Sequence, residues 1–195
     1  MQTRADLPDL STLYRTHVRD VARWAERLAG PGFDLPDLVH EVFEIAQRRL
    51  PSFRGDSSLA TWLFGITDKV VRHRRRKDRL RHWLAGSSTD VARHQAWPGP
   101  NQHEELERKE RIARVYDVLD RLSERDRQIL ILFELEELSG EQTAALLGIK
   151  VANVWLRMHR ARNRFIKVFR VSESECAAAA SESGSGAGRY RHAGS

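Results

Sequence analysis

The side chains best suited to chemistry in this sequence are arginines, and the chemistry they suit is the neutralisation of phosphate. Residues 151–165, VANVWLRMHRARNRF, contain Arg157, Arg160, Arg162 and Arg164. A second run, in residues 69–81, holds one acid among its bases, which are Lys69, Arg72, Arg74, Arg75, Arg76, Lys77, Arg79 and Arg81. Each phosphate that a cation neutralises releases counterions and adds salt-dependent affinity. Two separate basic segments favour a nucleic-acid partner, although a charge run is usually a solvated helix face.

The overall charge agrees with a partner that is negatively charged. The chain has 195 residues and a formal net charge of +6, which favours nucleic acid or acidic lipid over a cationic partner. Its length allows one domain or two small ones. Charge alone does not choose between these partners.

Catalytic motifs do not occur in the sequence. There is no HExxH, Gly-rich phosphate loop or GxSxG, and the eight histidines are scattered. The single Cys176 forms neither an internal disulfide nor a CxxC metal pair, which favours a reducing cytoplasm. No signal-peptide core or bilayer-length apolar stretch is present. We therefore predict a cytoplasmic protein that is not an enzyme and that holds no metal and no cofactor.

Helical periodicity organises the first part of the chain. Apolar residues recur at helical spacing over 10–29, and Gly30-Pro31-Gly32 ends that pattern. Asp34 is the predicted N-cap of a second helix that has Pro36 in its first turn. The turn PSFRGDSS follows, with Asp56 or Ser57 as the predicted cap of a third helix that continues into the basic run. Trp62 has the spacing of a core residue relative to Ile66, although an aromatic side chain there also suits a wedge that separates bases.

A second helical unit is predicted from residue 104. Ser123 with Asp126, and Ser139 with Gln142, have the spacing of N-terminal capping boxes. Gly148 then suits a left-handed helix C-cap between two short helices, with a small core of Ala144, Ile149, Val154 and Met158. This pattern predicts a helix-turn-helix whose second helix enters DNA. A plain αα-hairpin with a solvated basic face is the alternative that this segment alone leaves open.

No strand pattern appears, so we predict an all-α fold of two small helical domains joined by a flexible linker. The first domain covers residues 1–84. Residues 85–103 form the linker because they lose apolar periodicity and gather Ser, Gly, Pro and Asn. The second domain covers 104–171. Residues 172–195, SESECAAAASESGSGAGRYRHAGS, are predicted to be a disordered tail because they have little apolar surface to bury.

Taken together, two separate segments resemble the extracytoplasmic-function (ECF) group of bacterial RNA polymerase sigma factors, within the sigma-70 family. They are DLVHEVFEIAQRRLPSFRGDSSLATWLFGI and RLSERDRQILILFELEELSGEQTAALLGIKVANVWLRMHRARNRF. The resemblance covers roughly residues 10–83 and 104–170, in the family's order and spacing. It implies a first domain like sigma region 2 and a second like sigma region 4.

The resemblance also implies partners and the residues that meet them. The partners are core RNA polymerase, through the clamp of its largest subunit and the flap of its second largest, double-stranded and melted promoter DNA, and in many members an anti-sigma factor. The implied clamp contacts are Asp37, His40, Glu41 and Glu44. The implied contacts with the −10 element are Arg54, Ser57, Lys69, Arg72, Arg75 and Arg76. The implied contacts with the −35 element are Lys150, Asn153, Trp155, Leu156, Arg157 and Arg160.

The sequence departs from the family's pattern at three places. His40 replaces a common Gln, and Ile66-Thr67-Asp68-Lys69 with His73 replaces a common Asn and Asp. Trp155 and Leu156 stand where Lys or Arg and Ser are usual in the recognition helix. Because apolar groups pack on thymine methyls and Asn pairs with adenine, we expect a −35 element unlike the common one.

Two other kinds of protein compete with the sigma-factor interpretation. A helix-turn-helix transcription regulator that acts without polymerase would keep the DNA-reading helix, but the acidic polar face of residues 37–47 argues against it. A membrane-surface protein would use the basic helices on acidic lipid, but the apolar faces are needed for the two helical cores.

Overall fold

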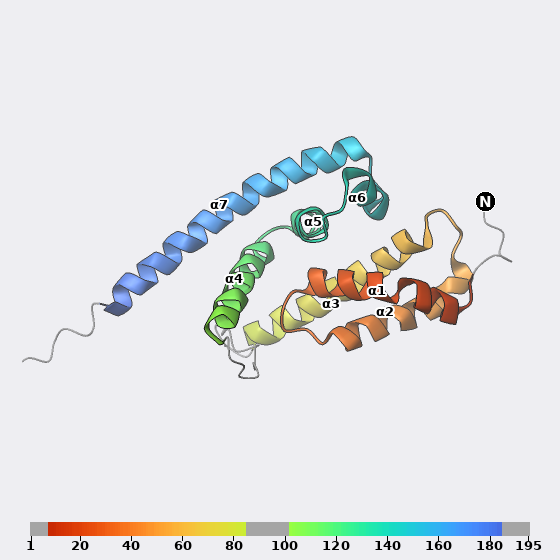
Figure 1. Cartoon of the computed structure of the whole chain (residues 1–195), viewed down its shortest axis with the longest axis horizontal. Helices are drawn as coiled ribbons and strands as arrows, with labels where there is room; N and C mark the ends of the chain where they lie inside the picture. The colour runs from red at the N-terminus through yellow and green to blue at the C-terminus, as the bar shows by residue number, and fades with distance from the viewer. Residues whose placement is uncertain (1–7, 85–101, 185–195) are drawn as a thin grey trace, which may run out of the picture.

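The protein was studied as a computed structural model, which describes residues 8–84 and 102–184. Every element of regular structure in these two ranges is helical, as the sequence predicts. Helices α1 to α3 form a first unit, and helices α4 to α7 form a second unit that lies beside it (Figure 1). The predicted linker falls almost entirely on residues 85–101, which lie outside the described residues.

Local capping sets the three helices of the first unit. Helix α1 (Leu10–Ala29) begins at Asp9, whose carboxylate accepts the Thr12 amide at 3.1 Å. Helix α2 (Leu35–Arg49) begins at the predicted N-cap Asp34, and a 3-10 turn, η1 (Leu50–Ser52), follows it. Helix α3 (Leu59–Leu84) is capped by Ser58, whose hydroxyl accepts the Thr61 amide at 3.1 Å. The predicted cap, Asp56 or Ser57, is wrong because only the residue directly before the helix can reach that amide.

The first unit buries the apolar faces of its three helices against one another. Trp24 of α1 and Phe64 of α3 meet edge to face, with ring centroids 5.4 Å apart. Trp62 is half-buried, and its ring lies 5.2 Å from that of Phe53. This position agrees with the core-packing interpretation of Trp62. The remaining core includes Leu13, Val21, Leu38, Val42, Leu63 and Val70.

The second unit contains the predicted helix pair. Helix α4 (Gln102–Asp120) precedes α5 (Glu124–Leu130) and a short π-helical turn, η2 (Ile131–Leu135). Helix α6 (Gly140–Leu147) has the full Ser139–Gln142 capping box. It ends at Gly148, which has a φ of 63°, and α7 (Val151–Gly184) follows. Val154 and Met158 are buried beneath α6, so the predicted core of the helix pair is confirmed.

Helix α7 is longer than the sequence indicates. It continues through Gly184, so residues 172–184 are helical, which corrects the predicted start of a disordered tail at residue 172. Two physical reasons account for the difference. The sequence there holds four successive alanines, the residue with the highest helix propensity, and Arg121 of the second unit binds Glu175 of α7 at 3.0 Å. The rest of the predicted tail, residues 185–195, lies outside the described part of the chain.

A network of charged side chains with two buried arginines joins the two units. Asp120, at the end of α4, accepts from Arg75 of α3 at 2.5 Å and from Arg127 of α5 at 2.6 Å. Both arginine side chains are almost fully buried, with exposed fractions of 4% and 2%. Arg127 also donates to the Leu28 carbonyl at 2.9 Å. Burial lowers the pKa of Arg127 to about 10, and the nearby Arg75 charge acts in the same direction.

Smaller contacts extend this junction along α1. The Tyr116 hydroxyl donates to the Arg27 carbonyl at 3.0 Å, and its ring lies against Gly30. Gly30 has a φ of 81°, and an added Cβ would come within 2.5 Å of that ring. Arg23 binds the buried carboxylate of Glu136 at 2.5 Å. The junction therefore combines charge pairs with a close backbone approach that needs glycine.

Candidate nucleic-acid interface

The first turns of α7 present a solvent-exposed polar face. Asn153, Leu156, Arg157 and Arg160 are all exposed, and their spacing of three or four residues places them on one side of the helix. Lys150 is exposed just before the helix begins. The structure thus brings together five of the six residues predicted to meet the −35 element. An exposed helix with Asn near its start and Arg further on can hydrogen-bond to base edges and to phosphates.

Trp155, the sixth residue, lies on a different side of α7. Its ring centroid is 5.3 Å from that of Phe133 in an edge-to-face contact. A Cβ added to Gly140, the first residue of α6, would come within 3.1 Å of the indole. The side chain is still 53% exposed. Trp155 therefore packs against Phe133 of η2 and beside Gly140 of α6, on another side of α7 from Asn153 and Arg157. The contact between Trp155 and bases that the resemblance implies stays a prediction.

Helix α3 carries a second exposed basic face. Lys69, Arg72 and Arg76 are exposed and recur at three- and four-residue intervals, so they share one side of the helix. Arg72 also binds Asp68, one turn earlier, at 2.6 Å. Burial raises the pKa of the Asp68 carboxyl, with Arg72 acting in the opposite direction. Arg75 is not part of this face because its side chain is enclosed by the network around Asp120.

The other two residues predicted for the −10 element lie in the turn before α3. Arg54 and Ser57 are both exposed there. Their turn and the exposed face of α3 are continuous in the chain, since α3 begins at Leu59. The exposed basic face begins at Lys69, ten residues into α3, whereas Thr61 in the first turn donates to the Ala145 carbonyl of α6 at 3.2 Å.

Helix α2 carries the acidic residues predicted to bind polymerase. Asp37, His40 and Glu44 are exposed, and the His40 Nε2 lies 3.4 Å from a Glu44 carboxylate oxygen. Glu41 is half-buried, and its carboxylate accepts from Arg74 of α3 at 2.6 Å. Three of the four side chains thus remain open to a partner, while Glu41 is held within the first unit.

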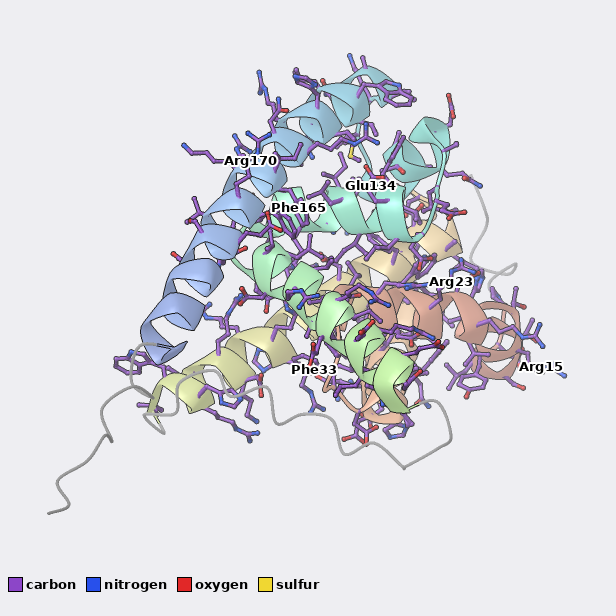
Figure 2. All side chains as sticks on the ribbon, turned by 60° about the vertical axis from the view of Figure 1, so that its left-hand side comes forward. Arg15, Arg23, Phe33, Glu134, Phe165 and Arg170 are labelled. Carbon is purple, nitrogen blue, oxygen red and sulfur yellow. The ribbon has the colours of Figure 1, made fainter. Side chains whose placement is uncertain are left out.

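An apolar groove of about 280 Å³ lies between α4, the α5–η2 segment and α7. Leu119 and Leu135 line it with Phe165 and Ile166, and Glu134 and Arg162 stand at its rim. Figure 2 shows Phe165 on the side of α7 that faces the element carrying Glu134. Leu106 and Ile112 are exposed on neighbouring α4. Such a groove suits the apolar face of a helix from another protein.

Two kinds of site are missing from the parts of the chain that the structure describes. Residues 8–84 and 102–184 contain no group of three His, Cys, Asp or Glu side chains placed to hold a metal ion. No helix in those ranges has the length and hydropathy needed to cross a bilayer.

Sequence reasoning missed the residues of the junction. Tyr116 has the spacing of an apolar-face residue, whereas Asp120 and Arg127 have no sequence feature that marks them, because each of the three also has a partner in the first unit. The role of Gly30 was predictable in part, because Gly30-Pro31-Gly32 predicts the end of the first helix. The close approach of Tyr116 to Gly30 had no signature in the sequence.

Comparison with protein families matches both units. Residues 13–81 match the family model for sigma-70 region 2, and residues 112–165 match that for sigma-70 region 4. The chain is 30% identical over 163 residues to the RNA polymerase sigma factor NccH of Alcaligenes xylosoxydans xylosoxydans, covering 83% of this chain and 87% of that protein. It is 31% identical over 139 residues to the ECF RNA polymerase sigma-E factor of Escherichia coli K12, covering 68% and 72%.

Comparison with solved structures finds proteins of similar fold. CnrH, solved in complex with the cytosolic domain of CnrY, has a TM-score of 0.52 and 24% identity, over 83% of this chain and 88% of that one. The sigma factor RpoE of Bartonella quintana, solved with the anti-sigma factor NepR, has a TM-score of 0.51 and 23% identity, over 84% and 98%. At these identities the similarity concerns the fold.

Proposed function

This chain belongs to the sigma-70 family of RNA polymerase sigma factors, in the ECF group, and we propose that it binds core RNA polymerase, opens promoter DNA and selects the genes to be transcribed. Residues 1–84 serve as the unit for polymerase binding and the −10 element. Residues 104–171 serve as the −35 unit, with 85–103 as the linker. The 172–195 segment has no assigned role in promoter recognition.

The observation that carries this proposal is the placement of two different surfaces on one chain. The exposed side chains of α2 include two carboxylates, Asp37 and Glu44, with His40 between them, and offer a polar, acidic face for a basic partner. The exposed face of α7, with Asn153, Leu156, Arg157 and Arg160, offers one for a major groove. A DNA-binding regulator that acts without polymerase has no use for the first surface, so this alternative is disfavoured.

The turn before α3 and the exposed basic face of that helix act together in promoter opening. Arg54 and Ser57 meet bases extruded from the −10 element, while Lys69, Arg72 and Arg76 neutralise backbone phosphates. Binding energy from these contacts offsets the cost of strand separation. Arg75 can join them only when the junction opens, because Asp120 and Arg127 now enclose it.

The −35 element is read by the exposed face of α7. Asn153 and Leu156 face base edges, Lys150, Arg157 and Arg160 hold the backbone, and Trp155 sets the angle at which α7 leaves α6. Side-chain geometry therefore supports a change in the role of Trp155, from base contact to positioning residue.

Two protein partners follow from the same surfaces. The apolar groove beside Phe165 receives an apolar helix of the polymerase flap, in addition to the clamp contact on α2. An anti-sigma factor regulates the chain by covering these surfaces; two sigma factors of similar fold were solved with such a regulator or with a cytosolic regulatory domain. The chain works in the cytoplasm beside polymerase. Catalysis belongs to the polymerase, so the chain needs no cofactor or metal of its own.

The polymerase contact is tested by capture of core RNA polymerase on the immobilised full chain. The double variant Asp37→Lys/Glu44→Lys reverses charge on α2, and Glu104→Lys/Glu173→Lys makes the same change at exposed positions elsewhere. We expect the α2 variant to lose at least about tenfold in affinity, equal to about 1.4 kcal/mol. Equal capture by both variants would count against the α2 contact.

A further inference from the structure

The second unit covers one side of α3, the helix that carries the basic run of the first unit. Arg75 of this run lies 2.5 Å from Asp120 of α4 and 3.5 Å from Glu124 of α5. Arg79, one turn later, lies 3.5 Å from the same Glu124 carboxylate. Carboxylates of the second unit therefore hold two cations of the run through ion pairs that cross the junction.

Asp120 occupies the position in which a phosphate would meet Arg75. A guanidinium group binds carboxylate and phosphate oxygens in the same way, through short charge-assisted hydrogen bonds. The Arg75 side chain is only 4% exposed, and Arg127 donates to the same Asp120 oxygen at 2.6 Å. A DNA phosphate therefore reaches Arg75 only after Asp120 has moved away, so the two acceptors exclude each other.

Contact between the units also limits the distance between the two DNA-binding faces. The Thr61 hydroxyl of α3 donates to the Ala145 carbonyl of α6 at 3.2 Å. Lys69 of the −10 face and Asn153 of the −35 face each follow that contact by eight residues. At about 1.5 Å per helical residue and at most about 3.6 Å per extended residue, the two faces lie within about 50 Å of each other. Elements about 25 base pairs apart are separated by about 85 Å on straight duplex DNA, at about 3.4 Å per base pair. The joined units therefore cannot meet both elements at once.

The buried charge on the second unit keeps its partner when the units separate. Arg127 stays bound to Asp120, because both residues belong to the second unit. Its bond to the Leu28 carbonyl of the first unit is exchanged for bonds to water. Polar contacts of this kind are typical of units within one chain that move relative to each other. Separation thus exchanges polar contacts and releases Arg75 to a new partner.

We propose that the junction is an autoinhibitory contact in which Asp120 competes with promoter phosphates for Arg75. It keeps the two DNA-binding faces together until the units separate. The inference rests on the proposed function, which assigns Arg75 and the exposed face of α3 to the −10 element. In the joined form the chain meets one promoter element at a time. In the separated form Arg75 gains a phosphate, and both faces reach their elements.

The test compares full-chain variants that open the junction in two different ways. Asp120→Asn removes the competing charge, whereas Gly30→Ala places a Cβ within 2.5 Å of the Tyr116 ring and leaves every charge unchanged. The first control is Asp117→Asn, which makes the same charge change at a half-exposed position of the same helix. The second control is Gly65→Ala, where nothing lies within 4 Å of the added Cβ. Circular dichroism verifies that each variant keeps the helical fold.

Small-angle scattering measures separation of the units, and fluorescence anisotropy measures affinity for a short duplex of scrambled sequence. We expect Asp120→Asn and Gly30→Ala to have a larger radius of gyration than their controls. In about 100 mM KCl they should bind the duplex about fivefold to tenfold more tightly, because one phosphate contact is gained. The slope of log K against log salt should become steeper by about 0.9. Adding Arg75→Gln to either variant should abolish this gain.

Three results would overturn the inference. The first is a larger radius of gyration without tighter binding, and the second is a radius and an affinity that both match those of the controls. The third is a gain in affinity that survives Arg75→Gln. Because no polymerase is present, failure of this test leaves the polymerase proposal standing, and failure of polymerase capture leaves the autoinhibitory contact standing.

Discussion

Replacing Asp120 by Ala would leave two buried guanidinium groups facing each other across the junction. Asp120 accepts from Arg75 at 2.5 Å and from Arg127 at 2.6 Å, and these two side chains are only 4% and 2% exposed. Breaking a buried pair by removing one partner costs about 3–5 kcal/mol. Asp120 is itself 45% exposed, and Glu124 stays 3.5 Å from Arg75. We therefore expect a loss of about 3 kcal/mol, at the lower end of that range.

The assay is urea unfolding of the full chain followed by circular dichroism, with Asp117→Ala as the matched control. Asp117 lies on the same helix and binds Arg121 at 3.0 Å, but both side chains are about half exposed. Exposed pairs contribute about 0–1 kcal/mol, so the control should change little. If the two units separate without unfolding, small-angle scattering will show a larger radius of gyration for Asp120→Ala alone. Equal stability and equal radius of the two variants would refute this reasoning.

Three further predictions concern single positions. Gly30→Ala should destabilise the chain by about 1–3 kcal/mol in the same urea assay, because the added Cβ would meet the Tyr116 ring. The control is Gly65→Ala, which should be neutral or stabilising because nothing lies within 4 Å of the added Cβ. Burial raises the pKa of Asp68 above its usual 3.8, so its contribution to stability is complete below pH 3.8 and is lost as the pH rises through the folded-state pKa. The free energy of unfolding of Asp68→Asn should not show that decrease with rising pH. Parallel curves of unfolding free energy against pH for Asp68→Asn and the unchanged chain would contradict the prediction. Asn153→Ala should relax one position of the −35 preference by about 1–3 kcal/mol in a binding-site selection, whereas Trp155→Phe should keep the same preference; the opposite pattern would show that Trp155 reads bases.

Local rules were sufficient to predict most of the helices. The Ser139–Gln142 capping box and the left-handed Gly148 depend on residues a few positions apart, so the helix-turn-helix follows from the sequence alone. The start of α3 was missed by one or two positions because Asp56, Ser57 and Ser58 are all good caps. Choosing among them needs the exact first turn of the helix.

Burial of charge was not predictable from the sequence. Arg75 belongs to a basic run, and only the arrival of Asp120 from the other unit makes it a junction residue. Arg127 likewise needs Asp120 and the Leu28 carbonyl as partners, which come from different helices. Long-range partners of this kind leave no periodic signal.

Residue spacing was sufficient to predict on which side of the recognition helix a side chain lies. Asn153 and Trp155 are two residues apart, which places them on different sides of a helix. Similarity to the family's common pattern predicts that Trp155 faces DNA. Its ring packs against Phe133, while 53% of the side chain stays exposed.

Promoter-directed transcription is the most direct test of the central claim. Core RNA polymerase is incubated with and without the full chain on genomic promoter fragments, and run-off transcripts are compared. The chain as a sigma factor should yield transcripts of defined start and length that core polymerase alone does not produce, and Asp37→Lys/Glu44→Lys should reduce them. No promoter-dependent transcript above the level of core polymerase alone would contradict the assignment.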